Sequence, residues 1–198
     1  MQENAIDKLR FTYGRNLMKP SDLSIWTFKN LVQFITQPPK QFLEFITTLR
    51  EMLALDPEEY QRSKRHLPYF LPVVFNPPYR KIENVSEIYG FIIDVDKCSR
   101  IDTHPEILKE QLSHDENILL MFTSPSGDGL KVLFYFETPL TDPSAYQQFY
   151  KQFVEQWALR HNIVRAVDTR THDAARVCFL SYDPNLYCNE KALPVAFD

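Results

Sequence analysis

The sequence predicts an α+β fold, in which a ferredoxin-like βαββαβ unit follows an N-terminal α/β subdomain. Two observations support this prediction. Strand-like and helix-like apolar patterns follow one another in the order β, α, β, β, α, β through the second half of the chain, and helix-start signals mark both halves. The chain has 198 residues, of which 44% are hydrophobic, which is enough for one well-packed domain. We expect a single domain with an N-terminal subdomain over residues 1–83 and a ferredoxin-like half over residues 84–198.

The elements of the second half follow from apolar periodicity and turn signals. Asp142-Pro143 gives an N-cap with proline at the first helical position, and an aromatic stripe at helical spacing continues to about residue 161. The pattern predicts strands over residues 89–96, 118–124, 130–136 and 176–181, and helices over residues 105–112 and 143–161.

The first half is predominantly helical in its pattern. Apolar residues at helical spacing predict a helix over residues 39–54, and Asp56-Pro57 starts a short helix that ends near residue 66. Residues 23–28 have strand character, and so do residues 69–75, where Pro72 indicates an edge strand.

Composition excludes several classes of protein. The net charge of −4 is not that of a general nucleic-acid coating protein. With 15 Phe and 10 Tyr, disorder is not expected. The three cysteines include no CxxC pair, which favours reduced thiols and a cytoplasmic location, and Cys98 with His104 gives too few ligands to favour a zinc site. No signal peptide or membrane-spanning run is present, so no membrane partner is expected.

Two aspartates at the end of an apolar strand are the most informative feature. Asp94 and Asp96 close the segment FIIDVD, and alternation of strand side chains places both on one face, roughly 7 Å apart. Adjacent carboxylates repel each other unless a cation lies between them, and Mg²⁺ or Mn²⁺ takes carboxylate oxygens together with substrate phosphates. The alternative is a strand that ends in two solvated aspartates.

The connection between the two middle strands reads SPSGDGLK. Asp-Gly is a strong hairpin signal, so a plain turn is one interpretation. The other is a phosphate cradle, in which Gly127 and Gly129 let backbone N–H groups approach an anion, Ser126 adds a hydroxyl and Lys131 a positive charge. The spacing is not that of a P-loop.

A third aspartate and an arginine complete the set of candidates. Asp168 stands eight residues before Arg176, which either neutralises a phosphate or pairs with a surface acid. His172 lies between them and is a further candidate contact to a phosphate.

Together, these motifs resemble the archaeo-eukaryotic primase superfamily. The order is an aspartate pair (FIIDVD), a Ser-Gly-rich turn (SPSGDGLK) and a third aspartate followed by arginine (VDTRTHDAARVCF). The flanking stretches KRHLPYFLPVVF and RVCFLSYDPN resemble the virulence-associated-E N-terminal domain branch, which includes primase-polymerases of mobile elements and CRISPR-associated ones. The resemblance covers roughly residues 65–189.

The resemblance implies a role for each matched residue. It implies that Asp94, Asp96 and Asp168 are catalytic and bind two Mg²⁺ or Mn²⁺ ions. Ser126, Gly127, Gly129, Lys131, His172 and Arg176 are the candidates for holding the incoming nucleoside triphosphate. Lys131 departs from the histidine that many members carry, and a lysine neutralises phosphate only as a point charge.

We therefore expect a primase-polymerase catalytic domain with the archaeo-eukaryotic primase fold, which extends a strand from nucleoside triphosphates on a DNA or RNA template. A helicase or CRISPR-associated proteins are implied as partners. Template contact is predicted for the acid-free basic stretch over residues 61–81, through Arg62, Arg65, Arg80 and Lys81. The alternatives are a catalytically silent nucleic-acid-binding accessory protein and a palm-type nucleotidyl cyclase.

Overall fold

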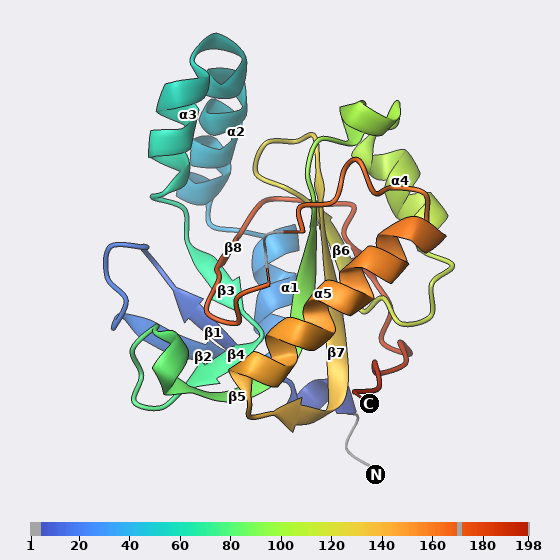
Figure 1. The fold of residues 1–198 in the computed structure, drawn as a ribbon. Coiled ribbons are helices and arrows are strands. Elements are labelled where there is room, and N and C mark those ends of the chain that lie inside the picture. Colours follow the sequence, from blue (N-terminus) through green and yellow to red (C-terminus); the bar gives the residue numbers. More distant parts are fainter. Residues whose placement is uncertain (1–4, 170–171, 198) are drawn as a thin grey trace.

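Two antiparallel sheets and five α-helices form the described part of the chain (Figure 1). The computed structural model describes residues 5–169 and 172–197. Within these residues, no helix is long and apolar enough to cross a membrane. The α-helices are α1 (Phe28–Thr36), α2 (Lys40–Leu55), α3 (Pro57–Lys64), α4 (Pro105–Leu112) and α5 (Pro143–Arg160). The strands are β1 (Phe11–Gly14), β2 (Leu23–Trp26), β3 (Tyr69–Leu71), β4 (Val73–Phe75), β5 (Val85–Val95), β6 (Leu120–Thr123), β7 (Leu130–Leu140), β8 (Cys178–Phe179) and β9 (Tyr187–Cys188). The short 3₁₀ helices are η1 (Ala5–Lys8), η2 (Ile82–Asn84) and η3 (Cys98–Ile101).

The larger sheet has the order β4-β5-β7-β6-β9, and α5 crosses one of its faces (Figure 1). Alternate residues of β5, among them Phe91, turn toward this helix and are fully buried. The Phe91 ring stacks on Phe134 of β7 at 5.0 Å and meets Phe153 of α5 edge-on at 4.9 Å. This face of the sheet forms the main core together with α4 and α5. Aromatic contacts of this kind stabilise the core beyond the burial of apolar area.

The smaller sheet has the order β2-β1-β3-β8 and belongs to a second core. This core joins α1, α2 and α3 to the other face of β6 and β7, where Phe122 and Leu133 are buried. The larger sheet is therefore covered on both faces, which explains why most of β7 is apolar.

Helix starts follow the sequence signals. The Asp56 carboxylate accepts hydrogen bonds from the backbone N–H groups of residues 58 and 59 at the start of α3, and Asp142 accepts one from Ser144 at the start of α5. Both helices have proline at their first position, as predicted. α1 was not predicted, although Thr27 and Asn30 form a complete capping box there.

The segment that was predicted as one strand over residues 69–75 is two strands. Pro72 separates β3, which belongs to the smaller sheet, from β4, which belongs to the larger one. Because proline has no N–H group, the hydrogen-bonded ladder is interrupted there, and the chain changes sheets at that residue.

The last predicted strand, over residues 176–181, is different in the structure. Only Cys178 and Phe179 form a strand, β8, and it pairs with β3 of the smaller sheet instead of joining β5. The order β5-β7-β6 is that of the first three strands of a ferredoxin-like unit, and the α+β class is confirmed. Strand β4 takes the edge position beside β5.

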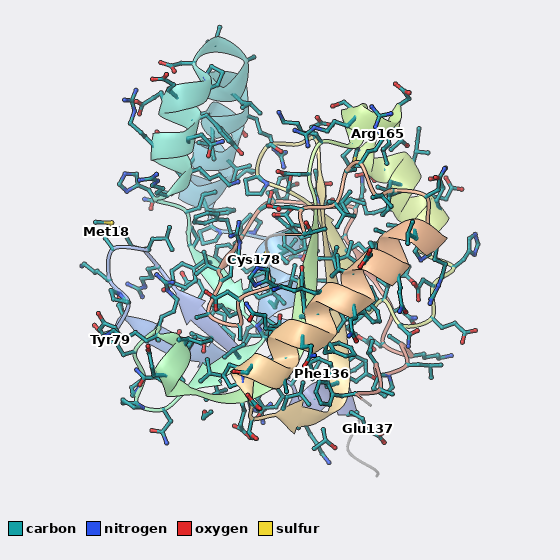
Figure 2. All side chains as sticks on the ribbon, viewed as in Figure 1. Met18, Tyr79, Phe136, Glu137, Arg165 and Cys178 are labelled. Atoms are coloured by element: carbon teal, nitrogen blue, oxygen red, sulfur yellow. The ribbon has the colours of Figure 1, made fainter. Side chains whose placement is uncertain are left out.

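Figure 2 shows the distribution of side chains over this fold. Met18 and Tyr79 lie at the periphery and are exposed, whereas Cys178 lies in the interior. All three cysteines are free thiols, as predicted, and only Cys188 is exposed.

Candidate functional site

The end of β5 presents Asp94 on the face opposite the main core. Phe91, Ile93 and Val95 are fully buried toward α5, so strand alternation turns Asp94 the other way. Its cross-strand neighbour in β7 is Lys131. Side chains at directly opposed positions of antiparallel strands lie on the same face, so the strand pairing itself brings this carboxylate and this ammonium group together.

Asp168 is aligned with Asp94 by a short extension of the larger sheet. Val95 and Val167 form an isolated antiparallel bridge. The Asp168 N–H donates to the Asp94 carbonyl at 2.9 Å, and the Asp96 N–H donates to the Ala166 carbonyl at 2.6 Å. Asp168 therefore stands opposite Asp94 on the same face.

Each of these two carboxylates has a cationic neighbour. Lys131 Nζ forms an ion pair with Asp94 Oδ2, and Arg176 Nη2 lies 3.8 Å from Asp168 Oδ2. Burial by itself lowers the pKa of Lys131, but its neighbours, Asp94 foremost with Cys178 and Asp96, together outweigh this effect and the pKa is raised. Lys131 is therefore held charged beside the carboxylates. The structure brings together four predicted residues, Asp94, Asp168, Lys131 and Arg176.

The donor set suits a hard divalent cation. Asp94 Oδ1 is buried, and no described residue gives it a hydrogen bond, so this oxygen has a lone pair without a partner. No three His, Cys, Asp or Glu side chains of the described residues are grouped as a complete metal site. Mg²⁺ commonly uses only one or two carboxylates, and substrate phosphates and water complete its coordination. Asp94 and Asp168 would hold such an ion, and Asp96, which follows β5, is near enough to influence the pKa of Lys131.

The SPSGDGLK connection is a hairpin loop between β6 and β7. Its last strand pair is Thr123–Leu130, and the Ser124 N–H donates to the Gly129 carbonyl at 2.8 Å. Gly127 has a φ of 82°, which favours glycine. A side chain on Gly129 would collide with the Val95 carbonyl oxygen. The hairpin interpretation is confirmed, and phosphate binding by Ser126 stays a prediction.

Helix α3 adds residues that the sequence analysis missed as site residues. Tyr60 is buried, and its hydroxyl makes no hydrogen bond of good geometry with a described residue, although Ser126 is near enough to influence it. Burial raises the pKa of Tyr60 to about 12. The positive charge of Lys131 lowers this pKa, and the negative charge of Asp96 raises it. Lys64, one turn later, faces the same region. The sequence signals predicted this helix but not what its face with Tyr60 and Lys64 covers.

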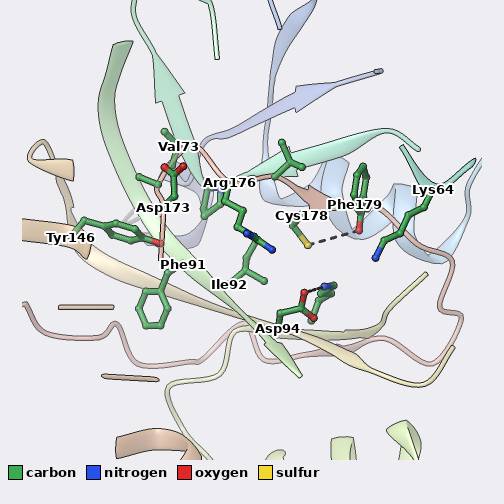
Figure 3. A pocket seen from close by; sticks show the side chains of 15 residues that line it. Lys64, Val73, Phe91, Ile92, Asp94, Tyr146, Asp173, Arg176, Cys178 and Phe179 are labelled. Atoms are coloured by element: carbon green, nitrogen blue, oxygen red, sulfur yellow. Dashed lines mark hydrogen bonds and ion pairs between the residues drawn. The ribbon is translucent and has the colours of Figure 1, made fainter. Parts of the chain in front are cut away.

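A small cavity of about 110 Å³ lies beside Asp94 and Lys131 (Figure 3). Lys64, Asp94, Lys131, Arg176 and Cys178 contribute to its wall. Burial raises the pKa of the Cys178 thiol to about 12, so this cysteine stays neutral near pH 7.

Residues 62–188 match the family described as BT4734-like, N-terminal domain. The match covers more than half of the chain. The chain belongs to this family. The matched range of the BT4734-like domain contains every predicted site residue, from Arg62 to Arg176.

Two further comparisons concern single proteins. The structure is similar to the AEP domain of the primase-polymerase of cyanophage S-2L, with a TM-score of 0.43 and 10% sequence identity over 96% of this chain and 85% of that one. No curated protein matches this BT4734-like domain.

Other predicted residues of the BT4734-like domain lie apart from the cavity. His172 Nδ1 is 2.7 Å from Gln147 Nε2 of α5, and His172 does not line the cavity that contains Asp94. Arg62 is exposed and forms an ion pair with Glu59 at 2.9 Å.

The two cations after β4 differ in their surroundings. Arg80 lies over the Tyr69 ring at 5.5 Å and its Nη1 donates to the Ala175 carbonyl at 3.5 Å, so part of its function is structural. Lys81 is exposed and lies over the Tyr79 ring, and Arg65, at the end of α3, is exposed as well.

Proposed function

We propose that this BT4734-like domain is a metal-dependent nucleotidyltransferase of the primase-polymerase type, which adds nucleotides from nucleoside triphosphates to a 3′-hydroxyl on a DNA or RNA template. The observation that carries the proposal is the alignment of Asp168 with Asp94 across the Val95–Val167 bridge, with Lys131 and Arg176 beside them. Carboxylates and cations on one face suit a metal-bound triphosphate, because the carboxylates hold the cation and the basic residues hold the phosphates.

The carboxylates and the basic residues would have different roles in the reaction. Asp94 and Asp168, with Asp96 beside them, would hold Mg²⁺ or Mn²⁺, which when bound lowers the pKa of the attacking hydroxyl and stabilises the pyrophosphate leaving group. Lys131 and Arg176 would bind the triphosphate and offset the negative charge that develops on its oxygens. To do so, Lys131 would exchange the Asp94 carboxylate for a phosphate.

The loop and the surface cations would complete the site. Ser126 and the backbone N–H groups around Gly127 and Gly129 would contact the triphosphate, and His172 would join them only after leaving Gln147. The exposed cations Arg62, Arg65 and Lys81, with Arg80, would track the template backbone. An RRM-like arrangement of β5, β6 and β7 would carry the reacting residues. The protein would act in the cytoplasm, in mobile-element replication or CRISPR-associated defence. Its partners would be a helicase or CRISPR-associated proteins.

The test is extension of a labelled primer on a template with Mn²⁺ or Mg²⁺ and nucleoside triphosphates. We expect extension by the wild-type protein and loss of extension in Asp94→Asn and Asp168→Asn, with Glu110→Gln on the exposed face of α4 as a matched carboxylate control. Extension that persists in both aspartate variants would exclude the assignment. Triphosphate consumption that needs neither template nor primer would identify a cyclase instead.

One observation favours a second candidate, a catalytically silent nucleic-acid-binding protein. Lys131 already neutralises Asp94, and the described residues contain no complete group of three metal ligands. A chain that has lost metal binding would retain such an internal ion pair. A silent protein would bind a primed template but would neither consume triphosphates nor gain stability from Mn²⁺, whereas the enzyme would do both.

A further inference from the structure

Lys64 is turned into the molecule, unlike its basic neighbours on α3. Arg62 and Arg65 are exposed, whereas Lys64 is partly buried and contributes to the cavity that contains Asp94. Figure 3 shows Lys64 at the opposite end of this cavity from Tyr146 and Asp173, with its ammonium group directed inward. The helical rotation between residues 62 and 64 accounts for the different directions.

The surroundings of the Lys64 ammonium group are aromatic and cationic. Its Nζ lies 5.8 Å from the centre of the Tyr60 ring and 5.6 Å from that of Phe179. Among the described residues, Lys64 has no carboxylate partner in an ion pair. Burial lowers its pKa, and the positive charge of Lys131 lowers it further, although Asp94 and Asp96 act in the opposite direction.

Three cations therefore line one small cavity, and they differ in how they are compensated. Lys131 is paired with Asp94 and Arg176 with Asp168, whereas Lys64 has only the faces of two rings. Cation–π contacts compensate a buried charge only partly. A partly buried ammonium group near a second ammonium group is unfavourable unless an anion joins them.

The volume of the cavity limits what this anion is. At about 110 Å³, the cavity is far below the ~300 Å³ or more of pockets that enclose a drug-sized ligand. A phosphate group is of the right order of size, and a whole nucleoside is not. A compact ammonium group is also a suitable partner for a single phosphate group.

We propose that Lys64 is a substrate-contacting residue that binds a phosphate group of a polyphosphate chain, while the nucleoside of that substrate lies outside the cavity. The proposal adds to the proposed function a phosphate contact that comes from the N-terminal part of the chain. It gives α3 a direct part in substrate binding, separate from the template role of its exposed cations.

Calorimetric titration with inorganic tripolyphosphate at low ionic strength, without divalent metal, tests the proposal. The proteins are the wild type, Lys64→Met, Lys64→Arg and, as a matched control, Lys40→Met, because Lys40 is an exposed lysine on the adjacent helix α2. Loss of one charge-assisted contact should weaken binding about ten- to hundredfold in Lys64→Met. Lys64→Arg should bind within a few-fold of the wild type, and Lys40→Met should be unchanged.

Two results would overturn the proposal: wild-type protein that does not bind tripolyphosphate, or Lys64→Met that binds it within twofold of the wild type. Thermal unfolding of each variant checks the fold, and Lys64→Gln replaces Lys64→Met if the latter is unfolded. The readout does not depend on catalysis. Lys64-dependent binding without primer extension would support this inference and reject the proposed function, whereas extension with Lys64-independent binding would do the reverse.

Discussion

Removal of the Lys131 charge should destabilise the protein strongly. The side chains of Lys131 and Asp94 are 8% and 20% exposed, so Lys131→Met leaves a largely buried carboxylate, of which one oxygen already lacks a partner. Loss of one member of a buried ion pair costs about 3–5 kcal/mol, and residual access of Asp94 to water places this case near 3 kcal/mol. In a chain of this length, that corresponds to a decrease in Tm of about 6–12 °C.

Urea unfolding of the single variants and of Lys131→Met/Asp94→Asn measures the pair as a double-mutant cycle. The double variant removes both charges and should recover much of the lost stability, with a coupling of about 2 kcal/mol. Mg²⁺ or Mn²⁺ should stabilise Lys131→Met more than the wild type, because the cation no longer competes with an ammonium group. A loss below about 1 kcal/mol together with zero coupling would refute this reasoning.

Three further outcomes check other parts of the structure. Hydrogen bonds from Lys109 and a backbone N–H group outweigh burial and lower the pKa of Asp183. Its stabilising effect is therefore present above its ordinary pKa near 3.8 and is lost as the pH falls below that value. Urea unfolding at each pH should show that Asp183→Asn lowers the free energy of unfolding at pH 7 and differs less from the wild type below pH 3. Gly90→Ala should cost about 3 kcal/mol in the same assay, because its Cβ would collide with the Phe134 carbonyl oxygen, and a variant of wild-type stability would contradict this packing. Of the three thiols, only that of Cys188 is exposed, so it alone should react with an aromatic disulfide in the native protein, and slowly, because partial burial raises its pKa to about 11; fast reaction of all three thiols would show that the fold is different.

Local sequence signals predicted the elements that depend on local chemistry. Asp56-Pro57 and Asp142-Pro143 start helices because a carboxylate that caps N–H groups, followed by proline, favours a helix start in any context. The strand that carries Asp94 was predicted for the same kind of reason, since its alternation is local. The α1 helix was missed although its capping box is visible in the sequence at Thr27 and Asn30.

Sequence patterns could not predict which strands pair. The residues around Cys178 have strand composition, but their partner is β3, which is more than 100 positions away along the chain. The role of Lys64 depends on the same long-range packing. A basic residue between two others on a short helix indicates a solvated surface, and only the placement of α3 over β8 and the end of β5 turns Lys64 toward a cavity.

The change of sheets at Pro72 has a consequence for how the protein unfolds after its backbone is cleaved. Strand β4, from the first half of the chain, is an edge of the larger sheet, and strand β8, from the second half, is an edge of the smaller one. Each half of the chain therefore contributes one strand to the sheet that the other half mainly forms. A break in the backbone between residues 76 and 84 would leave both exchanged strands in place, so the two pieces should remain associated and unfold in a single transition, and neither piece alone would have a complete sheet.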